Sequence, residues 1–204
     1  MPLSPFVYLA SQSPRRQQLL DQLGVKHKPL LAGPDEDVER LEEERSNELP
    51  LDYVRRVTLL KLFAAQARLK RRKLPEAPIL CADTTVALGK RIMGKPASPA
   101  EAVEMLSALS GRTHRVMTAV VVSAGRERFL DTSISRVRFA AMSQQTIQRY
   151  VDSGEPRGKA GAYAIQSRIA AWISHIEGSY TGIMGLPLHE TTTLLSRVRV
   201  VMEV

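Results

Sequence analysis

The chain has 204 residues, of which 44% are hydrophobic and 25% are charged, as is ordinary for a globular protein. Its longest apolar runs, such as residues 119–122, are far shorter than the roughly 20 residues that span a bilayer, which argues against a membrane protein. The formal net charge of +8 suits a nucleic-acid partner, but it also suits a small polyanionic substrate.

Strand and helix patterns alternate in the first half of the chain, which predicts α/β layering. In chain order we first expect a buried strand at residues 6–10, a helix at 17–23 closed by Gly24, and a short apolar segment at 29–31. An acidic stretch with turn character follows at 35–44, and then a helix at 51–69. A buried strand is expected at 79–82 and ends at Asp83. Residues 85–88 either continue that strand or form its hairpin partner across residues 89–90.

The second half begins with the capping box Ser98-Pro99-Ala100-Glu101, which predicts a helix through Leu109. Further along we expect a long hairpin of residues 114–122 and 129–139 around Gly125, followed by a helix at 144–151. The last predicted elements are a strand at 172–176, a short helix after Pro187 and a final strand at 198–204. The hairpin brings antiparallel pairing into the sheet, so the sheet is expected to be mixed.

Groups that hold phosphate gather just after the first strand, in Ser11-Gln12-Ser13-Pro14-Arg15-Arg16. With Ser13 as N-cap and Pro14 at the first helical position, backbone N–H groups, hydroxyls, the helix dipole and two guanidiniums converge on one point. An ordinary capped helix with surface arginines would explain Ser13 and Pro14, but not Ser11 beside two arginines. A second such segment, rich in glycine, runs over residues 154–163.

Three further residues could serve a polyphosphate site. Asp83 lies where an apolar strand is expected to end, so its carboxylate could hold Mg²⁺ or orient a water, although it could also cap a turn. Lys95, in Gly94-Lys95-Pro96, lies on a stiff loop that could present an ammonium to phosphate. Lys61 lies at the edge of an apolar helical row, from which it could snorkel to solvent or reach into a cleft.

Other patterns are weak or absent. The acidic turn contains Asp35, Glu36 and Asp37 as candidate metal ligands, and the pattern does not choose among them. The single cysteine, Cys81, has apolar neighbours and is expected in the core. The four histidines lack the spacing of metal ligands, and there is no P-loop, dinucleotide-binding or nucleophile-elbow motif.

Taken together, five segments resemble the Maf family of nucleoside triphosphate pyrophosphatases, and they occur in family order over nearly the whole chain: residues 9–16, 81–86, 94–96, 109–114 and 159–166. The resemblance implies an α/β fold with a twisted mixed sheet, flanking helices and two lobes around a central cleft. It further implies a single domain over residues 1–204, a homodimer, and a divalent metal (Mg or Mn) used to split a nucleoside triphosphate into monophosphate and pyrophosphate.

The resemblance also implies roles for individual positions. Asp83 matches the family's proton acceptor and, with Glu36, a metal site. The residues that match phosphate-binding positions are Ser11, Ser13, Arg15, Arg16, Lys61 and Lys95. Arg15, Thr84 and Gln166 match positions that select the base, and the sequence around them is similar to the branch that hydrolyses dTTP and UTP.

We therefore expect a house-cleaning enzyme of the nucleotide pool, in the cytoplasm, because the start of the chain lacks the basic and apolar regions of a secretion signal. Its partner would be a nucleoside triphosphate, with no nucleic acid and no membrane. The alternative from another class is a regulator that binds nucleic acid or senses nucleotides without turnover, motivated by the +8 charge.

Overall fold

The computed structural model describes residues 3–203 and shows an α/β protein built on a seven-stranded mixed sheet. The strands are β1 (Val7–Leu9), β2 (His27–Pro29), β3 (Ile79–Leu88), β4 (Arg91–Met93), β5 (Thr113–Ala124), β6 (Glu127–Phe139) and β7 (Ile173–Glu177). They follow the order β2-β1-β3-β5-β6-β7, and β4 pairs with β3 off this path. The pairs β1–β2 and β1–β3 are parallel, and all others are antiparallel.

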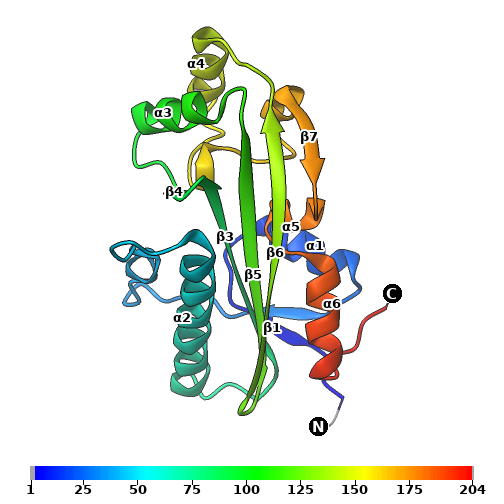
Figure 1. Cartoon of the computed structure of the whole chain (residues 1–204). Helices are drawn as coiled ribbons and strands as arrows, with labels where there is room; N and C mark the ends of the chain where they lie inside the picture. Colours follow the sequence, from blue (N-terminus) through cyan, green and yellow to red (C-terminus); the bar gives the residue numbers. More distant parts are fainter. Residues whose placement is uncertain (1–2, 204) are drawn as a thin grey trace.

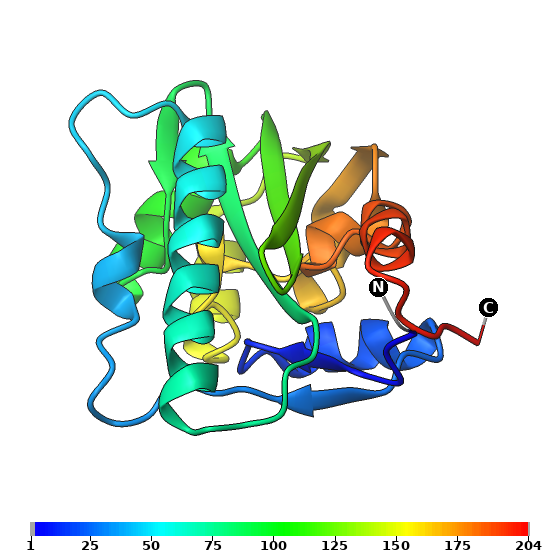
Figure 2. The same ribbon diagram turned by 90° about the horizontal axis from the view of Figure 1, so that it is seen from below.

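Helices cover both faces of the sheet. They are α1 (Pro14–Gln22), α2 (Pro50–Arg71), α3 (Pro99–Leu109), α4 (Gln144–Asp152), α5 (Tyr180–Met184) and α6 (Leu188–Arg197), with short 3-10 turns η1 (Glu39–Glu42), η2 (Ala160–Ala162) and η3 (Arg168–Trp172). The long strands β3, β5 and β6 run through the molecule, with α3 and α4 near one end, α1 beside their middle and α6 toward the other end (Figure 1). Seen along the other axis, α2 lies on one side of these strands and α6 on the other (Figure 2).

The buried apolar side chains form two lobes that share the long strands. One cluster joins α1, α6 and β1 to the first half of β3 and the second half of β5. Another joins α3, α4 and the segment around η2 to the opposite ends of the same strands. The predicted fold class, with two lobes on a mixed sheet, is therefore confirmed.

Most predicted elements are present, and one strand prediction is wrong. Of the two alternatives for residues 85–88, continuation of the strand is confirmed: β3 runs through Asp83 to Leu88, because Asp83 and Thr84 keep their pairing with Ala119 and Thr118 on β5. The Asp83 carboxylate can lie inside the strand because it is paired with a lysine, as described below. The hairpin across residues 89–90 also forms, with β4 as the partner of β3.

The predicted final strand over residues 198–204 does not form within residues 198–203, and Val204 lies outside the described residues. Val198 and Val200 are buried in the lobe around α1 and α6, so their apolar character reflects core packing. Val200 makes one isolated bridge to Ser4. The short helix α5 was not predicted, because its few residues lie in a segment whose glycine and serine content indicates a loop.

Candidate functional site

A cleft of about 480 Å³ opens between the two lobes, at the start of α1 and the middle of β3. Most of the predicted site residues line it: Ser11, Ser13, Arg15, Arg16, Lys61, Asp83, Thr84, Lys95 and Gln166. Segments far apart in the sequence therefore meet at one place. Glu36 is not part of this lining in residues 3–203.

Asp83 and Thr84 lie next to each other on β3 and face opposite sides of the sheet, since side chains alternate along a strand. Asp83 points to the side covered by α2, where its Oδ1 accepts a hydrogen bond from Lys61 Nζ at 2.5 Å. Asp83 is only 8% exposed. A carboxylate this deeply buried needs a cationic partner, and Lys61 supplies it.

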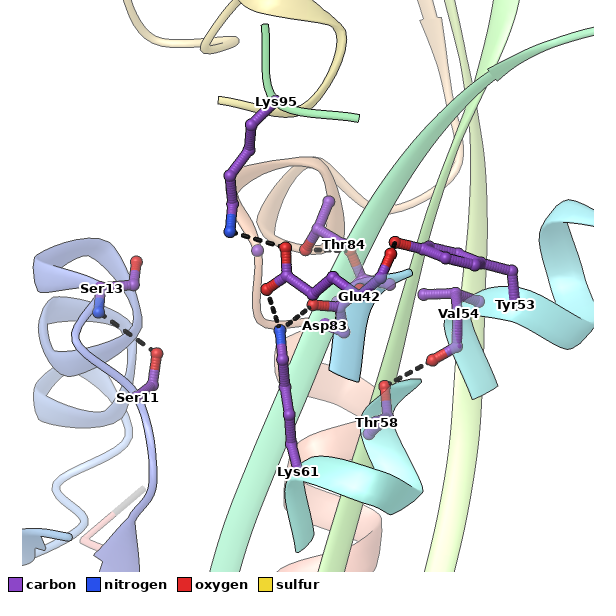
Figure 3. Close-up of polar contacts among 12 residues, drawn as sticks. Ser11, Ser13, Glu42, Tyr53, Val54, Thr58, Lys61, Asp83, Thr84 and Lys95 are labelled. Carbon is purple, nitrogen blue, oxygen red and sulfur yellow. Dashed lines mark hydrogen bonds and ion pairs between the residues drawn. The ribbon is translucent and has the colours of Figure 1, made fainter. Parts of the chain in front are cut away.

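Lys61 is shared with a second carboxylate, that of Glu42 at the end of η1. Lys61 Nζ donates to Glu42 Oε1 at 2.7 Å, and Lys95 Nζ donates to Glu42 Oε2 at 2.7 Å (Figure 3). Burial lowers the pKa of Lys61, but Asp83 and Glu42 outweigh burial and raise it above its ordinary value. Both acids and both lysines therefore form one alternating chain of charges along the wall of the cleft.

Arg16 lies on the opposite face of β3, where its partners are neutral. Its Nε donates to Gly185 O at 2.8 Å, Nη1 to Ser11 Oγ at 3.0 Å, and Nη2 to Thr84 Oγ1 at 3.4 Å. Burial lowers the pKa of Arg16, and the nearby charge of Asp83 acts in the opposite direction. The Arg16 side chain thus connects α1, β3 and the end of α5 while it carries a charge beside the cleft.

The loop before α1 differs in detail from the prediction. Pro14 does occupy the first turn and Ser13 is the N-cap by position, but the Ser13 hydroxyl makes no capping hydrogen bond. Instead, Ser13 N–H donates to Ser11 Oγ at 3.2 Å (Figure 3). Arg15 Nε donates to Met184 O at 3.2 Å, so both arginines also bind the main chain at the end of α5.

The segment that carries Gln166 is fixed on three sides. Gly161 has φ of +66°, and a Cβ there would lie 2.8 Å from the Val86 side chain, so the position requires glycine. Gly161 N–H also donates to Gly94 O, which links this segment to the loop of Lys95. Downstream, Tyr150 and Ser167 share a hydrogen bond at 2.9 Å. Gln166 itself is exposed at the edge of the cleft.

Tyr163, also in this segment, is held by a buried histidine that the sequence analysis treated as structural. The Tyr163 hydroxyl and His114 Nε2 lie 2.7 Å apart, and burial lowers the pKa of His114 to about 4. The histidine is therefore neutral at physiological pH and serves to fix Tyr163. Cys81 is fully buried as expected, and burial raises the pKa of its thiol to about 12.

The carboxylate of Glu36 is bound by two arginines of α2. Arg68, 4% exposed, donates to Glu36 through Nε at 3.0 Å and through Nη2 at 2.6 Å, and Arg71 donates at 2.5 Å. Hydrogen bonding from Arg68 lowers the pKa of Glu36 to about 2. Among Asp35, Glu36 and Asp37, the structure thus singles out Glu36 as the half-buried partner of α2, but it does not bring its carboxylate to Asp83.

Glu42 is the residue that sequence reasoning missed. It lies in the acidic stretch 35–44, where nothing distinguishes it from Glu39, Glu43 and Glu44. Its contact with Lys61 and Lys95 depends on how the long connection between β2 and α2 folds back over the cleft. In residues 3–203 no group of three or more acidic, histidine or cysteine side chains is arranged to hold a metal ion.

An α/β fold whose cleft gathers arginines and lysines around a buried carboxylate has the features of a protein that binds polyphosphates. The family model described as "Maf-like protein" matches residues 6–198. The chain therefore belongs to the Maf family. Within the part of the chain that the structure describes, no helix is both long and apolar enough to cross a membrane.

Several curated relatives are similar over nearly their whole length. One from Polaromonas sp. (strain JS666) is 64% identical over 96% of each chain, and one from Albidiferax ferrireducens is 61% identical over 95% of this chain and 96% of the relative. A relative from Burkholderia pseudomallei is 54% identical over 98% and 96% of the two chains. All three are named dTTP/UTP pyrophosphatase.

Among solved structures, a nucleoside-triphosphatase, or dITP/XTP pyrophosphatase, from Mycobacterium abscessus matches with a TM-score of 0.39 and 15% identity. The match covers 67% of this chain and 75% of that chain. At this distance the likeness bears on neither substrate nor mechanism.

Proposed function

We propose that this protein is a nucleoside triphosphate pyrophosphatase that hydrolyses dTTP and UTP to the monophosphate and pyrophosphate. Full-length relatives at 54–64% identity carry this name. The observation that carries the mechanism is the buried Asp83, held by Lys61 at one oxygen and placed beside the cations of a cleft large enough for a nucleotide. The enzyme would act in the cytoplasm and remove unwanted triphosphates from the nucleotide pool.

In the proposed reaction, a water attacks the α-phosphorus and the bond to the oxygen that bridges the α- and β-phosphates breaks. Asp83 accepts the proton of that water. Within the described residues, Lys61 binds Oδ1 of Asp83, and the other oxygen makes no hydrogen bond in the protein, so that oxygen can receive the proton. Pyrophosphate leaves with the electron pair of the broken bond.

The cations of the cleft would neutralise the charge of the bound triphosphate and the charge that develops on the pyrophosphate as it leaves. Arg15, Arg16, Lys61 and Lys95 are proposed as the phosphate-binding residues, with Ser11 and Ser13 on the loop before α1. Arg16 is best suited, because its partners are neutral and leave its charge available to an anion. Selection of the base is assigned to Gln166 at the cleft edge, with Arg15 and Thr84.

A divalent metal ion, Mg or Mn, fits this site chemically, because Asp83 has a free carboxylate oxygen beside a cleft that would receive phosphate oxygens. If Asp83 held the ion through this oxygen, together with the substrate, the same oxygen would not accept the proton, so the two roles of Asp83 are alternatives. When bound, the ion would polarise the phosphate and reduce its charge. Glu36 stays the predicted second ligand, although in this structure Arg68 and Arg71 occupy its carboxylate.

The experiment that tests the reaction measures the products from dTTP, UTP, CTP, GTP and modified triphosphates with Mg²⁺ or Mn²⁺. Monophosphate and pyrophosphate in equal amounts are expected, whereas release of single phosphates would contradict the proposal. In ¹⁸O-labelled water the label should appear in the monophosphate, because the α-phosphorus is attacked. Salt-sensitive binding to oligonucleotides without any turnover would instead favour the regulator considered above.

The homodimer and the single domain over residues 1–204 are likewise proposals. Light scattering on the purified chain tests the first. For the second, limited proteolysis should yield one resistant core, because β3, β5 and β6 run through both lobes.

A further inference from the structure

Glu42 occupies an unusual place in the cleft. Its two carboxylate oxygens bind two different lysines, Lys61 from α2 and Lys95 from the loop after β4, each at 2.7 Å. Figure 3 shows the carboxylate between the two ammonium groups, opposite the loop of Ser11 and Ser13. Both lysines are among the proposed phosphate-binding residues.

The two lysines depend on Glu42 to different extents. Lys61, 18% exposed, also binds Asp83. For Lys95, 50% exposed, Glu42 is the one ion-pair partner in residues 3–203. A carboxylate that accepts one ammonium on each oxygen presents the same arrangement as two non-bridging oxygens of a phosphate group. Glu42 therefore gives the lysines an anionic partner at a separation that a phosphate can also bridge.

We propose that the Glu42 carboxylate occupies a phosphate subsite of the empty cleft and is displaced when the triphosphate binds. This inference rests on the proposed function, because it assumes that the triphosphate enters this cleft. In the empty protein, the Glu42 carboxylate lies between Lys61 and Lys95 and binds both. On binding, a phosphate group replaces the carboxylate between them.

The surrounding structure allows this exchange without a change of the main chain. The hydroxyl of Tyr53, a buried residue of α2, donates to the main-chain oxygen of Glu42 at 2.8 Å. This bond fixes the backbone at the end of η1, while the side chain of Glu42 is still 24% exposed. Rotation about the side-chain torsions of Glu42 can thus move the carboxylate into solvent while the segment stays in place.

The exchange has a measurable consequence, because Glu42 competes with the incoming anion. In Glu42→Gln the negative charge is lost, and the amide NH₂ faces one of the two ammonium groups. The empty site becomes less favourable, while the occupied site loses a repulsive neighbour. Both changes favour anion binding, so we expect the Kd for inorganic pyrophosphate to fall by about tenfold.

The test is calorimetric titration of inorganic pyrophosphate into the parent, Glu42→Gln and Glu39→Gln, in EDTA. Glu39→Gln is the matched control, because Glu39 lies on the same turn and lines the same cleft but makes no ion pair within the described residues. An exposed charge is largely screened, so the control should stay within about twofold of the parent. Steady-state kinetics should show that Glu42→Gln lowers the KM for dTTP by a larger factor than it changes kcat.

Unchanged or weaker pyrophosphate binding in Glu42→Gln would overturn the proposal. So would normal binding in EDTA combined with weaker binding in Mg²⁺, which would make Glu42 a metal ligand. If Glu42→Gln does not fold, Glu42→Asp is the second variant: its shorter side chain cannot bridge both lysines, and tighter binding is expected again. A parent that binds pyrophosphate but turns over no triphosphate would contradict the proposed function, while tighter binding in the variant would still support the role of Glu42.

Discussion

The two faces of β3 hold charge beside the cleft in different ways. On the α2 face, carboxylates and ammonium groups alternate from Asp83 through Lys61 and Glu42 to Lys95. On the other face, the hydrogen-bond partners of Arg16 within residues 3–203 are hydroxyl and carbonyl oxygens. A cation with neutral partners keeps its field available to an anion. A cation paired with a carboxylate is neutralised by it, and it can bind a phosphate group only when the carboxylate is displaced. The α2 face is therefore suited to proton transfer by Asp83 and to exchange of the Glu42 carboxylate for a phosphate group. The opposite face is suited to attracting phosphate at all times.

The largest effect is expected on the α2 face. Asp83→Asn keeps the shape of the side chain but cannot accept a proton, so turnover of dTTP should fall by at least about 10²-fold. Lys61 keeps Glu42 as a partner, and the fold should survive. Rates are compared with circular dichroism and thermal unfolding of the same preparation. Near-parent turnover in the folded variant would remove Asp83 from the mechanism.

On the opposite face, Arg16→Ala should raise the KM for triphosphates by about 10- to 100-fold, since a half-buried charged donor is lost. It should also lower the melting temperature, because Ser11, Thr84 and Gly185 lose their common partner. Arg15→Ala should weaken binding with a smaller loss of stability, because Arg15 makes a single hydrogen bond to the main chain in the described residues.

Arg16→Lys is the control for charge, since it keeps the cation but not the fork of donors. If Arg16→Ala and Arg15→Ala both bind and turn over triphosphates like the parent, the loop before α1 only begins the helix. The contrast between the two faces of β3 would then be structural and unrelated to substrate.

A smaller effect is expected at the far edge of the cleft. The Gln166 amide can donate to O4 of uracil or thymine and accept from N3–H, and cytosine reverses both positions. Gln166→Glu removes the donor, so kcat/KM for dTTP and UTP should fall by about tenfold or more. Because a carboxylate can accept from both N1–H and N2 of guanine, the relative preference should move toward guanine nucleotides.

The measurement is kcat/KM for UTP, dTTP, CTP, GTP and 7-methyl-GTP. Gln12→Glu is the matched control, because Gln12 also lines the cleft and gains the same charge. Gln12→Glu should lower kcat/KM for all triphosphates to a similar extent, without changing the order of preference among them. An unchanged ranking in Gln166→Glu would mean that Gln166 does not select the base.

The smallest effect concerns Glu36, the acid beneath the α2 face. Because its pKa falls from 4.5 to about 2 through Arg68, its contribution to stability is present above about pH 4.5 and is lost as the pH falls toward 2. Glu36→Gln should lower the free energy of unfolding by about 1 kcal/mol at pH 7, and the difference should shrink between pH 4.5 and pH 3. Urea unfolding across this range tests it, with Asp35→Asn as the control.

The same Glu36 variant tests the predicted metal site. If Glu36 is a ligand, Glu36→Gln should raise the Mg²⁺ concentration needed for half-maximal activity. If the carboxylate serves Arg68 and Arg71 alone, the Mg²⁺ dependence should match that of the parent while stability is lost.

Local patterns in the sequence predicted most elements, and most of the predicted site residues line the cleft. Pro14 after Ser13, the capping box at Ser98 and the turn at Gly125 act over a few residues, so they can be interpreted without the fold. The order of the motifs indicated the family, and with it the residues that meet at the cleft. Gly161 illustrates why such a pattern is informative, since a side chain there would collide with Val86.

Other features depended on contacts between distant segments. Local patterns left open whether the strand ends at Asp83 or continues, and Asp83 stays inside β3 because Lys61, 22 positions away, neutralises it. Val198 and Val200 have the composition of a strand but are buried as core residues against α1. Which of the acids at residues 35–44 faces Arg68 and which faces the lysines was decided by the path of the connection over the cleft. Short-range sterics and capping are written in the sequence, whereas the pairing of buried charges is decided only when the tertiary structure brings them together and excludes water.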